Sequence, residues 1–588
     1  MGSEMCIRDS RESFVSLKRF KSGLAGLILS SILIACGGSG GSSSPTPSTP
    51  PTGGPPPAPV PEAKPFTNLE TRAEASRFLI QAGFGGSDTE IDALVDTDAA
   101  DWIAAQMAMP ATKTFDAMLA AYPNTQDTDL LHNSMLYTNL LSADDVLRQR
   151  MLFALSQIFV ISDNNFFDRG HTTAHYTDIL TDNAFGDYRT LLEEITYSPA
   201  MGRYLTFYRN RKGDAESGRT PDENYAREIL QLFSIGLVEL NQDGTAKTPI
   251  AETYNNDDIF GLARVFTGLS GAGTSFSYHD QDEDWFRRPL QMYDDEHSPL
   301  EKTFLGTTIP AGALGDASIS QALDTITSHD NVAPFLSRQL IQRFTASSPS
   351  ADYVERVADV FDAGQFTAPN GRVFGTGQRG DFAAVIAAIL LDESMHDDIQ
   401  TATEGKLREP VIKFAHYNRS FDVSNIDVAN EGFLYDTSDP NEKLGQHPFR
   451  SPSVFNFYRP GYIAPLTESG DAGLTAPEFQ IVNQGSALGF SNFMTYFVIL
   501  PAEDPVSFPR FQPDFSAEIA LADDPQALID HLDIKLAGGH LSDATKSEIV
   551  DAVTTLEIDP SNIEADRLDR VQLGVIMMMS SGAFSVLN

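Results

Sequence analysis

The sequence predicts an all-α protein in which a large multi-helix body with long irregular loops follows a disordered N-terminal lipoprotein tether. Apolar residues recur at helical spacing from residue 67 onward, and the only strand-like pattern is a short hairpin near Thr303–Ile309. The 588 residues are 41% hydrophobic, which is enough to bury a large core. Cys6 and Cys36 are the only cysteines, so a disulfide framework or a cysteine-based metal site within the folded part is excluded.

The helical pattern is interrupted by two long irregular intervals. Loops of such length in a compact protein usually carry function or cover a cleft, and they span residues 270–310 and 425–472. No repeat of fixed period is present, so a solenoid is not expected. The expected helices cover residues 69–82, 89–95, 99–107, 143–161, 171–183, 188–197, 199–209, 220–236, 257–268, 317–328, 332–344, 351–361, 382–391, 406–420, 477–497, 525–537, 542–556 and 565–586.

The N-terminus carries an export signal. Basic residues between Lys18 and Lys21 precede an apolar run, Gly23–Ala35, that is too short for an ordinary membrane span. The run ends in Leu-Ile-Ala-Cys, which resembles a bacterial lipobox, so residues 1–35 are expected to be removed and Cys36 to be lipidated. Residues 1–10 precede the targeting pattern and look like an unrelated upstream extension.

The predicted mature chain has two parts. Residues 36–66 are rich in proline, glycine and serine, which is typical of a flexible, partly polyproline-like linker, and residues 67–588 form the predicted helical domain. Gly37 follows the cysteine, a pattern that resembles lipoproteins sent to the outer membrane. We therefore expect an outer-membrane lipoprotein that contacts the membrane through Cys36, on either the periplasmic face or the cell surface.

The charge balance restricts the partners. The chain has 41 basic and 81 acidic residues, a net charge of −40. Such an excess of negative charge argues against nucleic acid, or an anionic membrane surface, as the main partner.

The stretch Thr220–Gly236 is the clearest helix signal, and we expect this helix to be central. Thr220 can cap the N-terminus, Pro221 suits the first helical position, Glu223 suits a capping box, and Gly236 can close the C-terminus. Apolar positions surround most of this helix, which is the pattern of a helix enclosed by others.

Charged residues occupy the first two turns of the same helix. Glu223 and Arg227, and likewise Asn224 and Glu228, are four positions apart and can meet on one face. Charges removed from water need partners, so two interpretations stay open. The first is an internal polar network that docks neighbouring helices, and the second is a carboxylate site.

Other motifs give weaker signals. His171 and His175 lie one helical turn apart and could bind a metal ion only if a third ligand converged on them. His297 and His329 stand beside acidic residues and are candidate general bases. The glycines at 375, 377 and 380 lack the βαβ context of a dinucleotide site. The alternating aspartates at 280, 282 and 284 do not complete an EF-hand, and they leave open only a weak calcium contact of another kind. No cofactor is therefore assigned.

Several blocks of sequence together resemble the bacterial family catalogued as domain of unknown function 1800. The blocks include ASRFLIQAGFG, RQRMLFALSQIFVIS, PDENYAREILQLFSIGLVELNQDG, SHDNVAPFLSRQLIQRF, GKLREPV and SPSVFNFYRPGY, in this order. The resemblance implies a mostly helical exported protein, often encoded beside a second family that resembles sulfatases, and it implies no established activity. The characteristic polar positions of the family correspond here to Glu223, Asn224, Arg227, Glu228, His329, Asn331, Arg408 and Glu409.

Two functional hypotheses follow. The first is a binding or assembly protein that works with an exported partner at the outer membrane, with exposed aromatic loops at 285–286 and 455–458 as its recognition surface. The alternative is a hydrolase of a periplasmic or extracellular polymer, with Glu223 or Glu228 as acid/base beside Arg227 and His329 or His297. The hydrolase requires an open cleft at the start of the central helix and a carboxylate oxygen without a protein partner.

Overall fold

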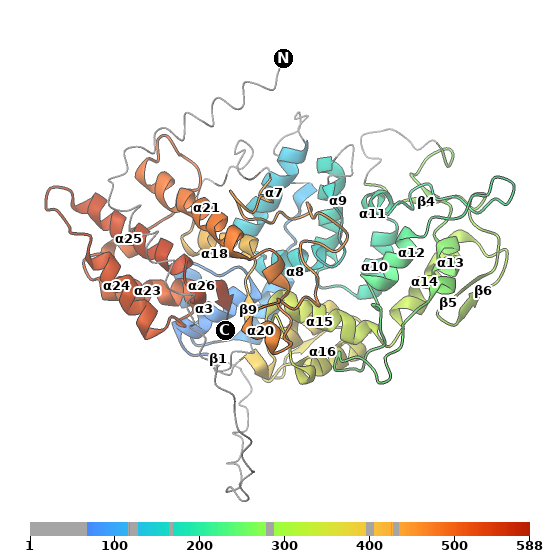
Figure 1. The fold of residues 1–588 in the computed structure, drawn as a ribbon, viewed down its shortest axis with the longest axis horizontal. Coiled ribbons are helices and arrows are strands. Elements are labelled where there is room, and N and C mark those ends of the chain that lie inside the picture. Colours follow the sequence, from blue (N-terminus) through green and yellow to red (C-terminus); the bar gives the residue numbers. More distant parts are fainter. Residues whose placement is uncertain are drawn as a thin grey trace, which may run out of the picture. The chain divides into compact units, whose positions relative to one another are not determined.

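Helices dominate the architecture, and the strands form only short two-stranded antiparallel pairs (Figure 1). The computed structural model describes residues 68–115, 117, 128–163, 169–277, 287–395, 405–424, 426, 434 and 436–587. Within the chain, residues 63–588 cluster as one compact unit. The all-α prediction for this body is confirmed. No helix in the described ranges combines the length and the apolar character needed to cross a membrane.

The first half of the body contains ten helices among the residues described. They are α3 (Arg72–Ala82), α4 (Asp88–Leu94), α5 (Ala99–Ala108), α7 (Thr128–Ser142), α8 (Val146–Ser156), α9 (Arg169–Asp182), α10 (Tyr188–Thr196), α11 (Pro199–Tyr204), α12 (Asn224–Gln231) and α13 (Asn256–Val265).

The second half continues with α14 (Gly315–Thr327), α15 (Val332–Phe344), α16 (Ala351–Ala363), α17 (Phe382–Leu390), α18 (Pro410–Ser420), α20 (Glu468–Asp471), α21 (Gln484–Glu503), α22 (Ser516–Leu521), α23 (Pro525–Ala537), α24 (Asp543–Thr554), α25 (Ile563–Met579) and α26 (Gly582–Ser585). Two short 3-10 helices cover Glu393–Met395 and Pro477–Gln480.

Each strand pairs with one partner. The pairs are β1 (Asn68–Leu69) with β2 (Thr97–Asp98), β3 (Leu269–Ser270) with β4 (Gln291–Met292), β5 (Lys302–Phe304) with β6 (Thr307–Ile309), β7 (Phe366–Thr367) with β8 (Val373–Phe374), and β9 (Lys406–Leu407) with β10 (Val586–Leu587). The hairpin expected near Thr303–Ile309 is β5–β6, in which Thr303 pairs with Thr308.

The core joins segments that are far apart in the sequence. One hydrophobic cluster contains residues from Leu69 to Phe584. In Figure 1 the blue helix α3 lies beside the red helices of the C-terminal segment, and hydrogen bonds confirm the contact. The Ser76 hydroxyl donates to the Ile534 carbonyl (2.7 Å), and the Arg77 guanidinium donates to the Gly538 carbonyl (2.9 Å).

The most enclosed helices are α8 and α18, because every residue of both is buried. The prediction had given this central place to the helix within Thr220–Gly236, but α12 keeps Asn224, Arg227 and Gln231 partly exposed. The charged side chains of that segment therefore lie mostly along a half-exposed face.

The helix α12 begins at Asn224, four residues after the predicted N-cap Thr220. The reason is tertiary, because hydrogen bonds from a neighbouring loop hold the preceding backbone in a non-helical conformation. The Asn210 side-chain oxygen accepts from the Asp222 amide (2.9 Å), and the Asp222 carboxylate accepts from the Asn224 amide (2.9 Å). At the other end Gly236 adopts φ +70° and donates to the Leu230 carbonyl (3.0 Å), so it closes the final turns as predicted.

Candidate functional site

An open cleft lies at the start of α12, between the loop after α11 and the segment that leads into α12. Its volume is about 400 Å³. The lining residues are Thr206, Arg209, Asn210, Arg211, Arg219, Thr220, Pro221 and Asp222. A cleft is therefore present at the place where the hydrolase hypothesis requires one.

The loop after α11 has an unusual backbone. Thr206 and Arg209 both adopt φ +64°, in the left-handed region that non-glycine residues rarely occupy. Strain of this kind costs of order 1 kcal/mol per residue and persists only where surrounding bonds hold it. The Tyr208 amide donates to the Gly202 carbonyl (2.7 Å), and the Arg209 amide donates to the Leu269 carbonyl (2.8 Å). The loop is thus fixed in a conformation that places its side chains in the cleft wall.

Two arginines of this loop are oriented by neighbouring groups. The Arg209 Nη2 donates to the Ser277 carbonyl (2.9 Å), and the Arg211 Nη2 donates to the Ser277 hydroxyl (3.3 Å). Arg211 also lies 3.4 Å from the Glu296 carboxylate and 5.0 Å above the Phe276 ring. These contacts hold both guanidinium groups at the cleft.

A third arginine reaches the cleft from the opposite wall. Arg219 pairs through its backbone with Asp214 in an isolated antiparallel bridge. Its Nε donates to the Lys212 carbonyl (3.0 Å), which is the one hydrogen bond of its guanidinium among the described residues. Most donors of Arg219 are therefore available to a ligand.

Asp222, the one acidic residue in the described part of the cleft lining, already has protein partners. The Asp222 carboxylate accepts from the Thr206 hydroxyl (3.1 Å) and from the Asn224 amide (2.9 Å). Its backbone is bonded on both sides by the Asn210 side chain. Asp222 thus shapes the cleft and is not a free carboxylate within it.

The sequence-predicted residues Glu223, Asn224 and Arg227 lie next to this cleft. Glu223 and Arg227 approach within 3.7 Å along the helix and are 33% and 42% exposed, so solvent screens the pair. Asn224 donates to the Thr206 hydroxyl (3.4 Å). The expectation that other segments supply charged partners for this pair is not met, because the two residues pair with each other.

Glu228 has a different environment. It is 8% exposed, and its Oε2 is buried without a hydrogen-bond partner among the described residues. Burial raises the pKa of Glu228, and the nearby Arg227 charge only partly opposes this rise. Burial also raises the pKa of Tyr204 to about 12, and the Glu228 charge contributes to that rise. A carboxyl group of this kind can hold a proton at a higher pH than an exposed glutamate.

Comparison with known protein families gives one match. The model of the family described as "Protein of unknown function (DUF1800)" covers residues 77–586 of this chain. The chain belongs to this family. The resemblance seen in the sequence blocks is thereby confirmed. No curated protein and no solved structure matches the chain.

Two polar positions that the DUF1800 resemblance implied lie at the turn between α14 and α15. The side-chain amide of Asn331 donates to the carbonyls of Ile235 (2.9 Å) and Val238 (2.7 Å), and its side-chain oxygen accepts from the backbone amide of Leu240 (2.9 Å). His329 accepts at Nδ1 from the backbone amide of Asn331 (3.1 Å), and burial lowers the pKa of His329. Asn331 therefore fixes the segment after α12, and His329 orients that turn. The described contacts do not bring His329 to Glu228.

Arg408 and Glu409 lie in the interior of the DUF1800 chain. The Arg408 guanidinium donates to the Phe584 carbonyl, stacks over the Phe584 ring (4.4 Å) and contacts His416 Nδ1 (2.8 Å). The Glu409 Oε2 accepts from the amides of Gln157 and Gln446. Both residues therefore act as structural links between helices.

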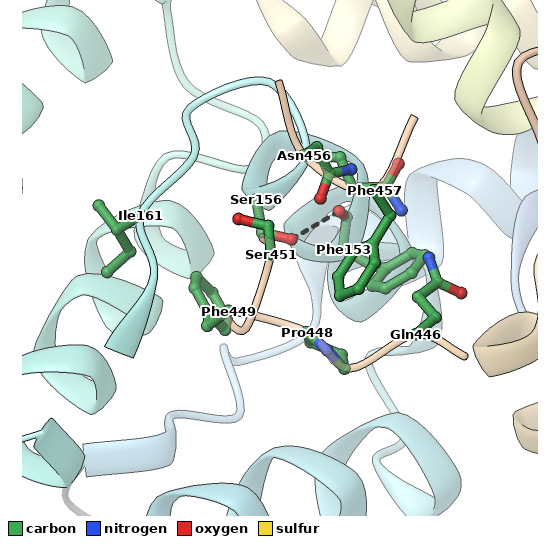
Figure 2. Close-up of a pocket in the computed structure, with 10 residues that line it drawn as sticks. Phe153, Ser156, Ile161, Gln446, Pro448, Phe449, Ser451, Asn456 and Phe457 are labelled. Carbon is green, nitrogen blue, oxygen red and sulfur yellow. Dashed lines mark hydrogen bonds between the residues drawn. The ribbon is translucent and has the colours of Figure 1, made fainter. Parts of the chain in front are cut away.

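A small cavity adjoins the Glu409 network (Figure 2). It lies between the end of α8 and the segment 446–457, and the Ser156 hydroxyl beside it donates to the Phe153 carbonyl (2.8 Å). Its volume of about 10 Å³ has room for a single water molecule and not for a substrate.

The aromatic segment 455–458 beside this cavity was predicted to be an exposed recognition surface. Tyr458 is 4% exposed, and its hydroxyl donates to Gln157 (2.9 Å), so that prediction is wrong for Tyr458.

The histidine pair on α9 faces a cation. The imidazoles of His171 and His175 lie 5.9 and 6.5 Å from the Phe115 ring, and the Arg287 guanidinium stacks 4.4 Å above the same ring. Burial, with a smaller effect of the Arg287 charge, lowers the pKa of His175 to about 4. A positive group beside the pair opposes the binding of a metal cation.

His297, the other candidate base, donates from Nδ1 to the Thr267 carbonyl (2.8 Å) in the interior. The residues at 280–286, which include the alternating aspartates and Trp285, lie outside the described residues, as does Cys36.

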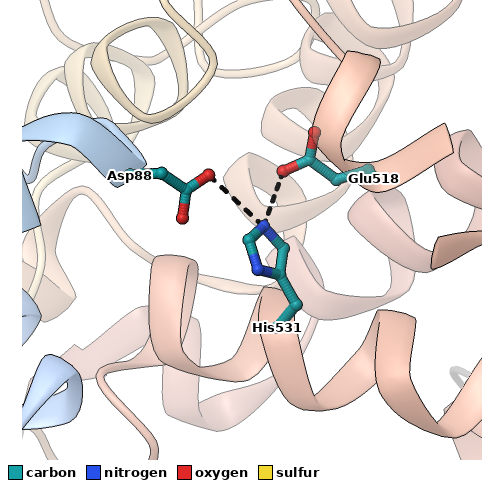
Figure 3. A group of neighbouring side chains, drawn as sticks. All are labelled: Asp88, Glu518 and His531. Carbon is teal, nitrogen blue, oxygen red and sulfur yellow. Dashed lines mark hydrogen bonds and ion pairs between the residues drawn. The ribbon is translucent and has the colours of Figure 1, made fainter. Parts of the chain in front are cut away.

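One group of metal-ligand type side chains occurs among the described residues, and Figure 3 shows it. Asp88, Glu518 and His531 place ligand atoms within 4.8 Å of one another. Lys535, however, lies 2.8 Å from the Asp88 carboxylate and 2.7 Å from the Glu518 carboxylate. Its ammonium group holds the position that a metal ion would need, so this cluster is an ion-pair network.

The arginine cleft was not found from the sequence. A signal was present, because the run Arg209–Lys212 contains three basic residues in a chain that is strongly acidic. The third arginine, Arg219, approaches them only through the fold. The cluster of Asp88 with Glu518 and His531 gave no local signal, because its members come from opposite ends of the body.

Proposed function

We propose that this DUF1800 protein is a binding protein of the bacterial cell envelope that takes its ligand into the cleft at the start of α12. The cleft is the observation that carries the proposal, since it has a volume of about 400 Å³ and a polar lining. The ligand-facing donors belong to arginines held on a constrained loop. A rigid wall of this kind lowers the ordering cost of binding.

The lining favours binding over hydrolysis. General acid/base chemistry needs a carboxylate or imidazole whose proton can reach the substrate. Among the lining residues that the structure describes, Asp222 is the only acidic one, and its oxygens already accept from Thr206 and Asn224. Glu228, whose Oε2 has no hydrogen-bond partner among the residues that the structure describes, does not belong to the described lining. Glu228, the carboxyl group that could act as a general acid, therefore does not line the cleft in which a substrate would bind.

The envelope location rests on the targeting pattern that ends in Cys36. Lipidation of Cys36 anchors the protein, and Gly37 supports the outer membrane as its destination. The expected pairing of the family with a second exported protein supports an exported partner that presents the ligand or receives it. Mass spectrometry of the mature N-terminus and membrane fractionation of a Cys36→Ser variant test the anchor. An unlipidated N-terminus in the native protein would refute it.

A photo-crosslinking amino acid at position 220 tests the binding site. Thr220 lines the cleft and is exposed, so the substitution leaves the wall intact. The matched control carries the same amino acid at Val506, which is 89% exposed and lies outside this cleft. We expect irradiated cells to yield an adduct at position 220 that is absent at position 506. The same products at both positions, or none at 220, would contradict the proposal.

A second function, hydrolysis of an envelope polymer, is favoured by one observation on Glu228. Its Oε2 has no hydrogen-bond partner in the described part of the chain, and burial raises its pKa, as a general acid requires. Asn224 stands one turn before Glu228 on the same face and contacts Thr206 of the cleft. A hydrolase would therefore donate a proton from just behind the cleft.

Purified peptidoglycan and envelope polysaccharide incubated with the protein test this alternative. For a hydrolase, Glu228→Gln is expected to lower the release of new chain ends by about 100-fold or more. The control is Glu548→Gln, an exposed glutamate on α24 that does not line the cleft. Circular dichroism establishes that both variants are folded. Equal activity of the Glu228→Gln variant and the native protein would eliminate Glu228 as the acid.

A further inference from the structure

We infer that the cleft recognises an oxyanion, a phosphate or carboxylate group of the ligand, through the guanidinium groups of Arg209, Arg211 and Arg219. The inference rests on the proposed function, because it names the chemical class of the ligand bound in the same cleft. It adds a basis for selectivity that neither the family nor the acidic composition of the chain supplies.

The local charge is opposite to that of the whole chain. The protein has 81 acidic and 41 basic residues, but among the described residues that line the cleft there are three arginines and a single aspartate. Charges beyond about 8 Å are largely screened at physiological ionic strength, so the lining dominates the potential inside the cleft. A site that attracts anions can therefore exist on an acidic protein, and the surrounding surface disfavours nonspecific binding of polyanions.

The single aspartate does not cancel this potential through contact with the arginines. Its carboxylate accepts from Thr206 and from the Asn224 amide. Among the described residues Arg219 uses its Nε for the Lys212 carbonyl and makes no other hydrogen bond. Its terminal nitrogens can therefore form a bidentate contact with a ligand oxyanion.

The other two arginines are oriented more firmly. Arg209 stacks 5.2 Å above the Tyr208 ring, and Arg211 stacks 5.0 Å above the Phe276 ring. The positive charge of Arg211 is partly balanced by the Glu296 carboxylate, at a distance of 3.4 Å. A planar guanidinium that is already oriented loses less entropy when it binds an anion.

The chemistry of these groups identifies the ligand class. Guanidinium groups match carboxylate and phosphate oxygens with two parallel hydrogen bonds, and such charge-assisted bonds are about twice as strong as neutral ones. A neutral ligand would leave three cationic side chains without new partners. A metal cation would be repelled by the same three groups.

The test uses the full chain and three probes: inorganic phosphate, acetate and neutral mannitol. Binding is measured by NMR line broadening of each probe at constant ionic strength. The test variant is Arg211→Gln with Arg219→Gln, and the matched control is Arg372→Gln, an exposed arginine that pairs with Asp101 far from the cleft. We expect phosphate or acetate to bind and mannitol not to bind. Each lost guanidinium should weaken binding about tenfold, which is the scale of one charge-assisted hydrogen bond.

Each outcome decides the inference. Weaker anion binding in the double variant, with unchanged binding in Arg372→Gln, supports it, and the probe that binds more tightly distinguishes phosphate from carboxylate. Equal binding in the double variant, or no anion binding to the native chain, overturns it. A double Arg→Lys variant that keeps the charge should retain part of the affinity, which separates recognition from loss of fold. If the adduct at position 220 forms but the anion does not bind, the binding function stands and the oxyanion assignment fails.

Discussion

Loss of one carboxylate from the Asp88, Glu518, His531 and Lys535 cluster should destabilise the contact between the two ends of the body. Glu518→Gln keeps the shape of the side chain and removes its charge. Glu518 is completely buried, with Lys535 at 2.7 Å and His531 at 2.9 Å. The variant would leave two cationic groups with Asp88 as their remaining carboxylate partner in the cluster.

The expected cost is about 3 kcal/mol, the lower end of the range for breaking a buried ion pair by removing one partner. The lower end applies because Asp88 is retained, 2.8 Å from Lys535, and because a Gln oxygen can still accept a hydrogen bond. Arg72, which also contacts Asp88, has a second carboxylate partner in Asp92 at 2.7 Å, so Asp88 can still balance part of the charge of Lys535 and His531. A loss much larger than this range would point to repacking of the surrounding helices.

Urea unfolding of the full chain, followed by tryptophan fluorescence, measures this cost. Trp102 packs edge-on against Phe78 of α3 at 5.2 Å, so it reports on the N-terminal side of the contact. The control is Asp523→Asn, which removes the exposed partner of Arg567 and should change the midpoint much less. If the Glu518→Gln midpoint equals that of the control, the cluster does not stabilise the contact and the reasoning is refuted.

The same cluster predicts a pH dependence with a definite sign. Burial alone would lower the pKa of His531, but bonds with Asp88 and Glu518 outweigh it and raise the pKa to about 9. The stabilisation from His531 is therefore complete below pH 6.5 and is lost as the pH rises through about 9. Burial alone would raise the pKa of Glu518, but the bonds with His531 and Lys535 outweigh this effect and hold the pKa below its usual range. Its contribution is present above the ordinary glutamate pKa and is lost as the pH falls. Stability should therefore decline on both sides of a mildly acidic optimum, and a flat profile between pH 6.5 and 9 would contradict this.

Three further predictions concern single positions. Burial raises the pKa of Glu228, so ionisation of Glu228 destabilises the folded state above the ordinary glutamate pKa. Glu228→Gln should therefore raise Tm at pH 7 and have little effect at pH 4. A lower Tm at pH 7 would contradict this. Gly261→Ala would place a Cβ 1.8 Å from the Thr303 carbonyl oxygen and should lower the free energy of unfolding in urea by about 3 kcal/mol. At the control position, Gly582→Ala, the new Cβ meets no atom within 4 Å, so the variant should be nearly neutral. Equal midpoints would refute the close approach. Glu409→Ala removes a buried acceptor of two amides and should cost about 3 kcal/mol by the same assay, and a cost below 1 kcal/mol would show that the interior network relaxes around the loss.

Local patterns in the sequence predict most of the helices because their determinants are local. The apolar spacing predicted α15 and α23 with the observed bounds. At the start of α17 the determinant is also local, because the Asp381 carboxylate accepts from the Ala384 amide. The helix α7, Thr128–Ser142, was missed because its apolar positions are interrupted by polar residues that the fold buries. Predicted residues 406–420 divide into strand β9 and helix α18, since the strand bonds to the distant β10.

The candidate site was predictable only in part. The sequence pointed to the start of α12, and the cleft lies there. It could not show that Glu223 and Arg227 remain at the half-exposed surface or that Asn210 delays the start of the helix, because both depend on the loop after α11. The partners of Arg408 and Glu409 come from distant segments, and no local pattern identifies them.

The pairing of α3 with α23 has a consequence for biosynthesis. The ribosome completes α3 long before it reaches Ile534 and Gly538, whose carbonyls bind Ser76 and Arg77. Until then Phe78 and Leu79 lack much of their final covering, so the nascent chain remains exposed to chaperones and proteases. Contacts between such distant residues also slow the final closure, because the end of the chain must be made before α3 can be covered.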